Sequence, residues 1–438
     1  MARVDRLARP AGPVPPWLPG EGSETRGTFL SSLTKRSGRS AAGLSAALLI
    51  AACSSGSGST AAPAATSVAP ARSSTGAPSL TVSDIGPSFS ALKTLAPLAP
   101  EGKGNVAVIL PDTTSSTRWT EFDAPYLKAA FAAAGLPPAN LTVQNAHGSD
   151  ATQVSMAQSD ITQGATVLII CPLDSGTGAH IEQLAAAAGV TVIDYDRLTL
   201  GGTRGYYVSF DNVRVGTVMG GGFTACVKAW HVKDPNVIVM KGAPTDNNAI
   251  LFAQGYDSVL APYFSSGEYK NVSNPPGSWD PTVSLGEFQE QSTAHKSINA
   301  ALTPNDSNAA AIIPYLRSQG VKPETFPLTG QDASLAGLQN ILAGYQCGTV
   351  YKPIYLEAGA TAALAMYVRA GQAPPASLVN GSVQDTTSKA LVPSVLAIPK
   401  WVNTANMNDT VVKDKFVAAS QLCAGQYASA CQAAGISG

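Results

Sequence analysis

Residues 190–216 read VTVIDYDRLTLGGTRGYYVSFDNVRVG, and this stretch decides the predicted fold. Its first four residues form an apolar, β-branched run, which is typical of a buried parallel strand. The run ends in a polar group: Asp194, Tyr195, Asp196 and Arg197. A second short strand, predicted for residues 206–210, ends at Asp211 and Asn212. Polar groups at the carboxyl ends of buried strands are what an open α/β sheet presents to a ligand, so we predict one wall of a polyol-binding cleft here.

Strand-like and helix-like segments alternate over most of the chain. The other predicted strands cover residues 105–110, 141–145, 166–171, 236–240, 298–302, 326–329 and 348–353. The predicted helices cover residues 126–134, 151–163, 180–188, 216–230, 252–260, 287–294, 309–318 and 355–369. Repetition at about 25–30 residues per unit is the signature of a parallel, doubly wound sheet. The alternation starts afresh at residue 236, which predicts two α/β halves.

Length and composition exclude several classes of protein. A chain of 438 residues allows two or three domains and a sizeable core. A net charge of -1 gives no electrostatic support for a nucleic-acid partner. Six cysteines are too few for a disulfide scaffold, and the four histidines form no ligand-spaced cluster with cysteine. We therefore expect no metal site, no cofactor and no nucleic-acid partner.

The N-terminal region predicts export. A basic segment at residues 35–39 precedes a short apolar run at residues 41–52, and Cys53 follows directly, which together describe a secretory signal. Residues 50–53, IAAC, resemble the lipobox of bacterial lipoproteins, in which the cysteine is acylated. About a dozen apolar residues cannot span the ~30 Å core of a bilayer. We expect lipidation at Cys53, and with it an anchor on the outer face of the cell membrane.

Seven motifs stand at predicted strand ends. They are Arg118-Trp119, Tyr195-Asp196-Arg197, Ser209-Phe210-Asp211-Asn212 with Val215-Gly216, PTDNNA at 244–249, Asn305-Asp306, Gly330-Gln331-Asp332 and Val350-Tyr351-Lys352-Pro353. In this order, over residues 105–419, they resemble the periplasmic sugar-binding proteins of ABC importers, and within them the D-xylose-binding type. The resemblance implies the type I periplasmic binding protein fold. In that fold two Rossmann-like, doubly wound α/β lobes are joined by a three-segment hinge, and a sugar lies between them.

The N-terminal pattern, the composition that follows it and the resemblance together predict a division of the chain. The expected parts are an N-terminal extension with the lipoprotein signal at 1–53, a disordered Ser, Gly, Ala and Pro tether at 54–102, an N-terminal lobe at 103–212 and 335–372, and a C-terminal lobe with the tail at 213–334 and 373–438. A Ser- and Gly-rich composition is typical of flexible linkers, which favours the tether.

Sugar hydroxyls both donate and accept hydrogen bonds, so a sugar site combines carboxylates, amides, arginine forks and aromatic faces. The expected ligand-binding residues are Arg118, Trp119, Asp196, Arg197, Asn212, Asn247, Asn248, Trp279, Asn305, Asp306, Gln331 and Asp332. A plainer alternative stays open for each, because Asp and Asn after a strand commonly cap helices or form turns. Asp246 is open to the capping interpretation, and Lys352 to a structural role at the hinge.

The cysteines allow one pairing to be favoured. Cys423 and Cys431 are eight residues apart, which is about 12 Å on one continuous helix and too far for a disulfide. If Gly425 breaks the helix the two can close, and export permits the bond, so we expect this disulfide. The pairing of the remaining three, Cys171, Cys226 and Cys347, is left open.

We expect an extracytoplasmic, monomeric solute-binding lipoprotein. It would capture a monosaccharide, xylose or a similar aldose, and deliver it to the permease subunits of an ABC transporter. One alternative is a sugar-sensing subunit of a membrane receptor. A carbohydrate-active enzyme is the other, and it would need two carboxylates flanking the scissile bond. The identity of the sugar is left open.

Overall fold

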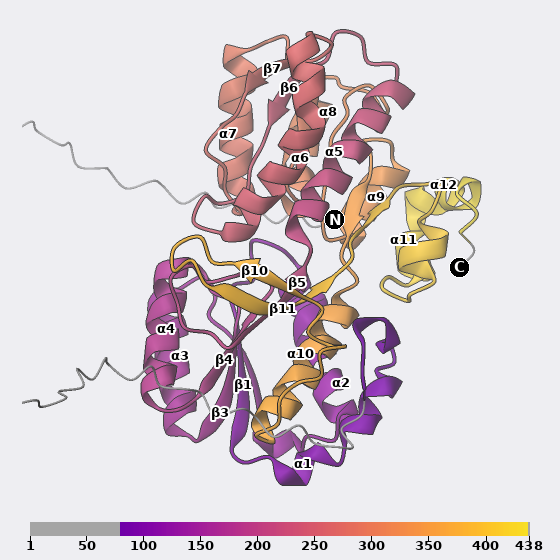
Figure 1. Cartoon of the computed structure of the whole chain (residues 1–438). Coiled ribbons are helices and arrows are strands. Elements are labelled where there is room, and N and C mark those ends of the chain that lie inside the picture. The colour runs from indigo at the N-terminus through magenta and orange to yellow at the C-terminus, as the bar shows by residue number, and fades with distance from the viewer. Residues whose placement is uncertain (1–78, 437–438) are drawn as a thin grey trace, which may run out of the picture. The chain divides into compact units, whose positions relative to one another are not determined.

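The computed structural model describes residues 79–436. The predicted signal, the Cys53 lipidation site and most of the predicted tether lie outside these residues. Within the described part, no helix is both long and apolar enough to cross a membrane. The strands form a seven-stranded, a three-stranded and a two-stranded sheet (Figure 1).

The seven-stranded sheet has the order β10-β11-β5-β4-β3-β1-β2. Its strands are β1 (Asn105–Leu110), β2 (Leu141–Asn145), β3 (Ala165–Ile170), β4 (Thr191–Tyr195), β5 (Tyr206–Phe210), β10 (Gly381–Gln384) and β11 (Leu391–Ala397). Neighbouring strands run parallel except for β10 and β11. The first five lie close to the predicted strands, because most of them are apolar runs buried on both faces of the sheet.

Helices cover both faces of this sheet. They are α2 (Ala124–Ala133), α3 (Asp150–Thr162), α4 (Ser175–Ala187) and α10 (Ile354–Arg369). Val106 and Val108 of β1 pack in the core that includes α2 and α10, whereas Ala107 and Ile109 pack with α3 and α4. Figure 1 shows these helix pairs on opposite sides of the strands. The alternation along β1 follows the two-residue period of a strand and gives the predicted doubly wound arrangement.

Residues 79–102 were expected to belong to the disordered tether, and this prediction is wrong because they are folded. They form η1 (Val82–Asp84), η2 (Ser90–Leu95) and α1 (Leu98–Glu101). Leu92, Leu95 and Leu98 are buried in the core against α2 and α10. Three leucines at a spacing of three residues supply a continuous apolar face, which a disordered tether would not need.

The three-stranded sheet has the order β7-β6-β8 with parallel neighbours. Its strands and helices are β6 (Asn236–Val239), β7 (Lys270–Ser273), β8 (Ala300–Leu302), α5 (Asn212–Ala229), α6 (Asn247–Ser266), α7 (Pro281–Ala294) and α8 (Asp306–Ser318). The predicted strand at 326–329 contributes one bridge, between Leu328 and Ala301. A Cβ on Gly216 of α5 would collide with the carbonyl of Phe252, so glycine permits the close packing of α5 on α6.

The chain passes three times between the two α/β units. The passages follow β5, β9 (Thr349–Tyr351) and β11, and β9 pairs antiparallel with β12 (Lys400–Val402). Two expected lobe limits are wrong. α9 (Leu335–Leu342) packs against α8 rather than in the first unit, and β11 pairs with β5 in the first sheet rather than joining the second unit. The later two passages between the units therefore follow β9 and β11, not residues 334 and 372.

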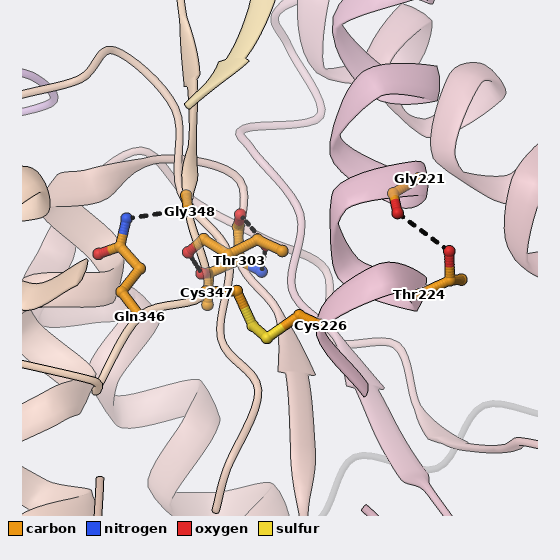
Figure 2. Close-up of a disulfide and its surroundings, with 8 residues drawn as sticks. Gly221, Thr224, Cys226, Thr303, Gln346, Cys347 and Gly348 are labelled. Atoms are coloured by element: carbon orange, nitrogen blue, oxygen red, sulfur yellow. Dashed lines mark hydrogen bonds between the residues drawn. A yellow bond between two sulfur atoms is a disulfide. The ribbon is translucent and has the colours of Figure 1, made fainter. Parts of the chain in front are cut away.

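Two disulfides close separate parts of the chain. Cys423 and Cys431 are bonded with their Cα atoms 5.7 Å apart, because α11 (Ala419–Leu422) ends before them and Gly425 adopts a φ of 61°. Cys226 of α5 is bonded to Cys347, which is 121 residues away in the segment before β9 (Figure 2). Among the described cysteines, Cys171 is a buried free thiol.

The tail beyond β12 contains η5 (Asn408–Val412), α11, η6 (Gly425–Tyr427) and α12 (Ala428–Ala433). Its apolar residues Val411, Phe416 and Leu422 share a core cluster with Leu338 of α9. The tail is thus part of the folded body.

Candidate functional site

A small cavity lies where strand ends of both α/β units meet. Three cations, three carboxylates, three amides, two serines and three aromatic rings line it. These residues are Arg118, Arg197, Lys352, Asp196, Asp246, Asp332, Asn248, Asn305, Gln331, Ser115, Ser116, Trp119, Trp279 and Phe252. The lining is mostly polar and charged, with three aromatic rings, which suits a single small polar molecule.

Arg118 is the cationic centre of the site and is buried. It precedes η3 (Trp119–Asp123), a π-helical turn, and such turns are frequent at functional sites. The wide turn brings Asp123, five residues on, to the same side, where its oxygens accept bonds from Nε at 2.9 Å and Nη2 at 2.7 Å. Nη2 also donates to Glu357 at 2.6 Å, and Nη1 donates to Asp196 at 2.6 Å.

These contacts leave the guanidinium charged and with one donor to spare. Burial alone would lower the pKa of Arg118, but Asp123, Asp196 and Glu357 outweigh it and raise the pKa well above its ordinary value. A guanidinium has five N–H donors, of which the three carboxylates take four. The fifth, on Nη1, makes no hydrogen bond to another described residue.

The backbone of Asp196 is held in an unusual conformation just after β4. Its φ of 62° lies in the left-handed region, which aspartate tolerates better than most residues. Its carbonyl accepts three hydrogen bonds of 2.8 Å, from the hydroxyls of Tyr207 and Ser209 and from Nδ2 of Asn248. Asn212 lies behind this group and donates to Oδ1 of Asn248 at 2.9 Å. The side chain of Asp196 is therefore presented to the cavity by a rigid support.

The carboxylate of Asp196 joins two cations. Its Oδ2 accepts from Nη1 of Arg118 and lies 3.4 Å from Nζ of Lys352. Burial would raise the pKa of Asp196, but Arg118, Lys352 and Arg197 together hold it well below its usual value. Nζ of Lys352 also lies 3.3 Å from Oδ1 of Asp332. Lys352 thus bridges an aspartate of the first unit and one of the second.

A second ion pair also lines the cavity. Nε of Arg197 lies 3.2 Å from Oδ2 of Asp246, and the same oxygen accepts from Nε1 of Trp279 at 2.9 Å. The Trp279 ring meets Phe252 edge to face at 6.3 Å. The ring of Trp119 lies 5.5 Å from the guanidinium carbon of Arg197. Aromatic surface therefore lies beside paired charges in the cavity.

The loop after β1 contacts strand ends of the second unit directly. Nδ2 of Asn305 donates to the carbonyl of Ser115 at 2.9 Å, and Oγ of Ser116 donates to Oδ2 of Asp332 at 2.8 Å. The neighbouring Oε1 of Gln331 is buried and has no hydrogen-bond partner among the described residues. A buried acceptor without a partner is costly, so this oxygen favours a ligand hydroxyl.

Comparison with known proteins shows the family to which the chain belongs. The family model described as "Periplasmic binding protein domain" matches residues 106–373. The D-xylose-binding periplasmic protein of Escherichia coli (strain K12) is 37% identical over 287 residues, which cover 65% of this chain and 83% of that protein. The chain belongs to the periplasmic sugar-binding proteins. Membership in this family of non-enzymatic binding proteins confirms the expected fold class.

Two further sugar-binding proteins extend the likeness over more of the chain. A multiple sugar-binding periplasmic receptor of Rhizobium radiobacter is 29% identical over 343 residues, which cover 75% of this chain and 95% of that protein. The solved structure of a carbohydrate transporter solute-binding protein from Chloroflexus aurantiacus, in complex with D-glucose, superposes with a TM-score of 0.64 at 26% identity. The superposition covers 72% of this chain and 97% of the chain from Chloroflexus aurantiacus.

The structure brings most of the predicted site residues of this sugar-binding protein together. The cavity is lined by Arg118, Trp119, Asp196, Arg197, Asn248, Trp279, Asn305, Gln331 and Asp332. Asn212, Asn247 and Asp306 do not line it. Asn212 supports Asn248 from behind, and Asn247 is buried at the start of α6. These three predicted ligand-binding residues therefore lie outside the lining of the cavity.

Five lining residues were not among the predicted ones. Asp246 and Lys352 were open to structural interpretations, and both do make structural contacts as well as facing the cavity. Phe252 falls within an apolar helix and carries no separate signal. Ser115 and Ser116 lie in a loop of small polar residues, where sequence pattern does not distinguish a lining hydroxyl from a solvated one.

Asp306 holds the loop that carries two lining residues. Its Oδ2 accepts from the amide of Ser334 at 2.8 Å, and its Oδ1 accepts from Nε2 of Gln346 at 2.8 Å. Its own amide donates to the carbonyl of Gln331 at 3.0 Å. Burial, together with the nearby charge of Asp332, raises the pKa of Asp306 to about 7.

This raised pKa predicts a pH dependence of stability. Between the unfolded-state value of about 3.9 and the folded-state value, the folded protein holds a proton that the unfolded chain has released. The free energy of unfolding should therefore fall as the pH rises through that window, and level off above about 7. The Asp306→Asn variant lacks the titrating group, so its profile should be flatter. Urea unfolding at a series of pH values measures both.

Asp280→Asn is the control for this experiment, because Asp280 is an exposed cap of α7 and asparagine also caps helices. It should keep the wild-type slope. If Asp306→Asn keeps that slope too, Asp306 does not titrate in this range.

Proposed function

We propose that this protein is an extracytoplasmic solute-binding lipoprotein. It holds one neutral monosaccharide between two lobes and delivers it to the permease of an ABC transporter. The observation that carries this proposal is the charge balance of a small cavity that is also lined by amides and aromatic rings. The lipid anchor at Cys53 and the delivery step rest on the sequence and on the family.

The charges of the cavity favour a neutral ligand. Each cation is already paired: Arg118 with Asp123, Asp196 and Glu357, Arg197 with Asp246, and Lys352 with Asp196 and Asp332. An added phosphate or carboxylate would therefore bring an uncompensated negative charge into a buried site, which is costly. Sugar acids and sugar phosphates should be rejected.

The remaining groups favour a polyol with an apolar face. A spare N–H of Arg118 offers a donor, and the partnerless Oε1 of Gln331 offers an acceptor. A hydroxyl can satisfy either, since it is both donor and acceptor. The rings of Trp119 and Trp279 supply the apolar surface that the C–H face of a sugar ring contacts. Xylose, glucose and similar aldoses have this combination.

The relatives support an aldose. One is named for D-xylose, and a solved relative at 26% identity holds D-glucose. A sensing role is the second candidate, because another relative is named a receptor. Deleting the gene separates the two roles: loss of sugar uptake indicates transport, whereas loss of a sugar-induced response with intact uptake indicates sensing.

A ligand panel tests the proposal. The body from residue 79 onward should be melted with D-xylose, D-glucose, D-galactose and L-arabinose. A sugar at about a hundred times its Kd stabilises the folded state by roughly 2.7 kcal/mol and should raise the Tm by several degrees. D-glucuronate is the matched control, because it differs from D-glucose by a carboxylate at C6.

At least one neutral aldose should raise the Tm, be recovered unchanged and bind at least tenfold more tightly than D-glucuronate. If no aldose raises the Tm, the proposal that the ligand is a monosaccharide is refuted. Equal binding of D-glucose and D-glucuronate would refute the argument from charge balance.

A further inference from the structure

The C-terminal tail, residues 403–436, is in contact with the segments that carry two cavity cations. One segment is η3, which follows Arg118, and the other is β9, which precedes Lys352. The tail itself does not line the cavity. Its buried residues form one apolar cluster with Phe122 of η3 and Tyr351 of β9.

Phe416 is the point where the two segments meet the tail. Its ring stacks on Phe122 with centroids 3.9 Å apart and planes within 13°. It also meets Tyr351 edge to face at 5.0 Å and 62°. Phe122 is adjacent to Asp123, the carboxylate that holds Arg118, and Tyr351 is adjacent to Lys352. The buried ring of Phe416 thus packs against both of the segments that carry the cavity cations.

A polar contact fixes the same region. Oδ2 of Asp414 accepts from the hydroxyl of Tyr351 at 3.1 Å and from that of Tyr355 at 3.3 Å. Tyr355 belongs to α10, on the first unit, while Tyr351 ends the strand that passes between the units. The tail is therefore bonded on both sides of one passage.

The far end of the tail is anchored to the second unit. The Cys423–Cys431 disulfide closes it, and the carbonyl of Gln421 accepts from Nε2 of Gln339 on α9 at 3.3 Å. The tail thus touches the first unit at Phe122, the passage at Tyr351 and the second unit at α9. Any change in the angle between the units would have to repack this cluster.

We propose that the tail is a brace that positions Arg118 and Lys352 for the ligand, with Phe416 as its principal positioning residue. The inference deepens the proposed function and rests on it for the nature of the ligand. Binding groups must be held within about 0.5 Å of their productive geometry. Arg118 and Lys352 have long side chains, and the segments that carry them are fixed from behind by Phe416.

The test compares Phe416→Leu with Phe288→Leu in the otherwise intact protein. Phe288 is a matched control, because it is also a buried phenylalanine in an aromatic cluster, with Tyr315 and Phe326, but it lies in α7 away from the tail. Both variants should lose stability. Phe416→Leu should weaken the binding of D-xylose or D-glucose by about tenfold, whereas Phe288→Leu should leave the affinity within about twofold.

Hydrogen exchange supplies a readout that needs no ligand. Phe416→Leu should speed exchange of the amides in residues 117–123 and 349–352, and Phe288→Leu should not. If wild type binds no aldose, the proposed function fails, yet this exchange pattern still decides whether the brace exists. Unchanged exchange at both segments in Phe416→Leu would overturn the inference, as would equal affinity losses in the two variants. Phe416→Met replaces Phe416→Leu if the latter does not fold.

Discussion

Asp196→Asn should weaken binding of the preferred neutral aldose by about 100-fold or more, the largest loss of affinity that we expect from one substitution. Asparagine has the same shape and also tolerates the left-handed φ of 62°, so the backbone should stay in place. The substitution removes the charge that pairs with Arg118 and Lys352. Calorimetric titration with the aldose identified for wild type measures the loss.

Asp280→Asn, at an exposed cap, is the matched control and should bind like wild type. Near-ultraviolet circular dichroism checks that Asp196→Asn retains its tertiary structure. A folded Asp196→Asn variant with an affinity within threefold of wild type would show that Asp196 does not bind the sugar.

Removing the Cys226–Cys347 disulfide should cause the largest loss of stability. The bond closes a loop of 121 residues, and the loop-closure model assigns about 4–5 kcal/mol to a loop of that size. The double variant Cys226→Ala and Cys347→Ala should lose about that much free energy of unfolding, as measured by guanidinium unfolding.

The second disulfide provides an internal comparison. Cys423 and Cys431 are eight residues apart, for which the same model gives about 2–3 kcal/mol. The variant Cys423→Ala with Cys431→Ala should therefore be the milder of the two. If the two double variants lost equal stability, the entropy of the unfolded chain would not be the main contribution of the longer bridge.

The strands and their polar ends could be predicted because two signals coincide there. The apolar run of β4 is long enough to be a buried strand, and Asp196 with Arg197 follows it immediately. Carboxyl ends of parallel strands meet at one edge of a sheet, so residues distant in sequence are brought to the same cavity. Residues 190–216 thus carry both the fold and two lining residues.

Which of the predicted side chains line the cavity depends on the directions in which they point, and residue spacing does not determine those directions. Asn247 and Asn248 are adjacent on α6, where successive side chains point about 100° apart, and only Asn248 faces the cavity. Asp306 and Asp332 both follow strands, yet Asp306 bonds its neighbouring loop instead of the cavity. The sequence carried no signal for these rotations.

Some secondary-structure elements were not predicted, and the cause there is different. Strands β10 and β11 contain exposed and polar positions, so no apolar run marks them; they form because β11 adds to the open edge of β5. Residues 79–102 follow a low-complexity segment, and their leucines gain an ordered structure only from the core of the first unit. Both elements depend on contacts with distant residues.

The pairing of every cation that lines the cavity with a carboxylate also bears on how salt affects binding. A site with a net charge attracts a ligand of opposite charge over several ångströms, and dissolved ions screen that attraction. A site with paired charges and an uncharged ligand has no such long-range attraction to lose. If the ligand is a neutral sugar, as proposed, its rate of capture should be about the same in dilute and in concentrated salt.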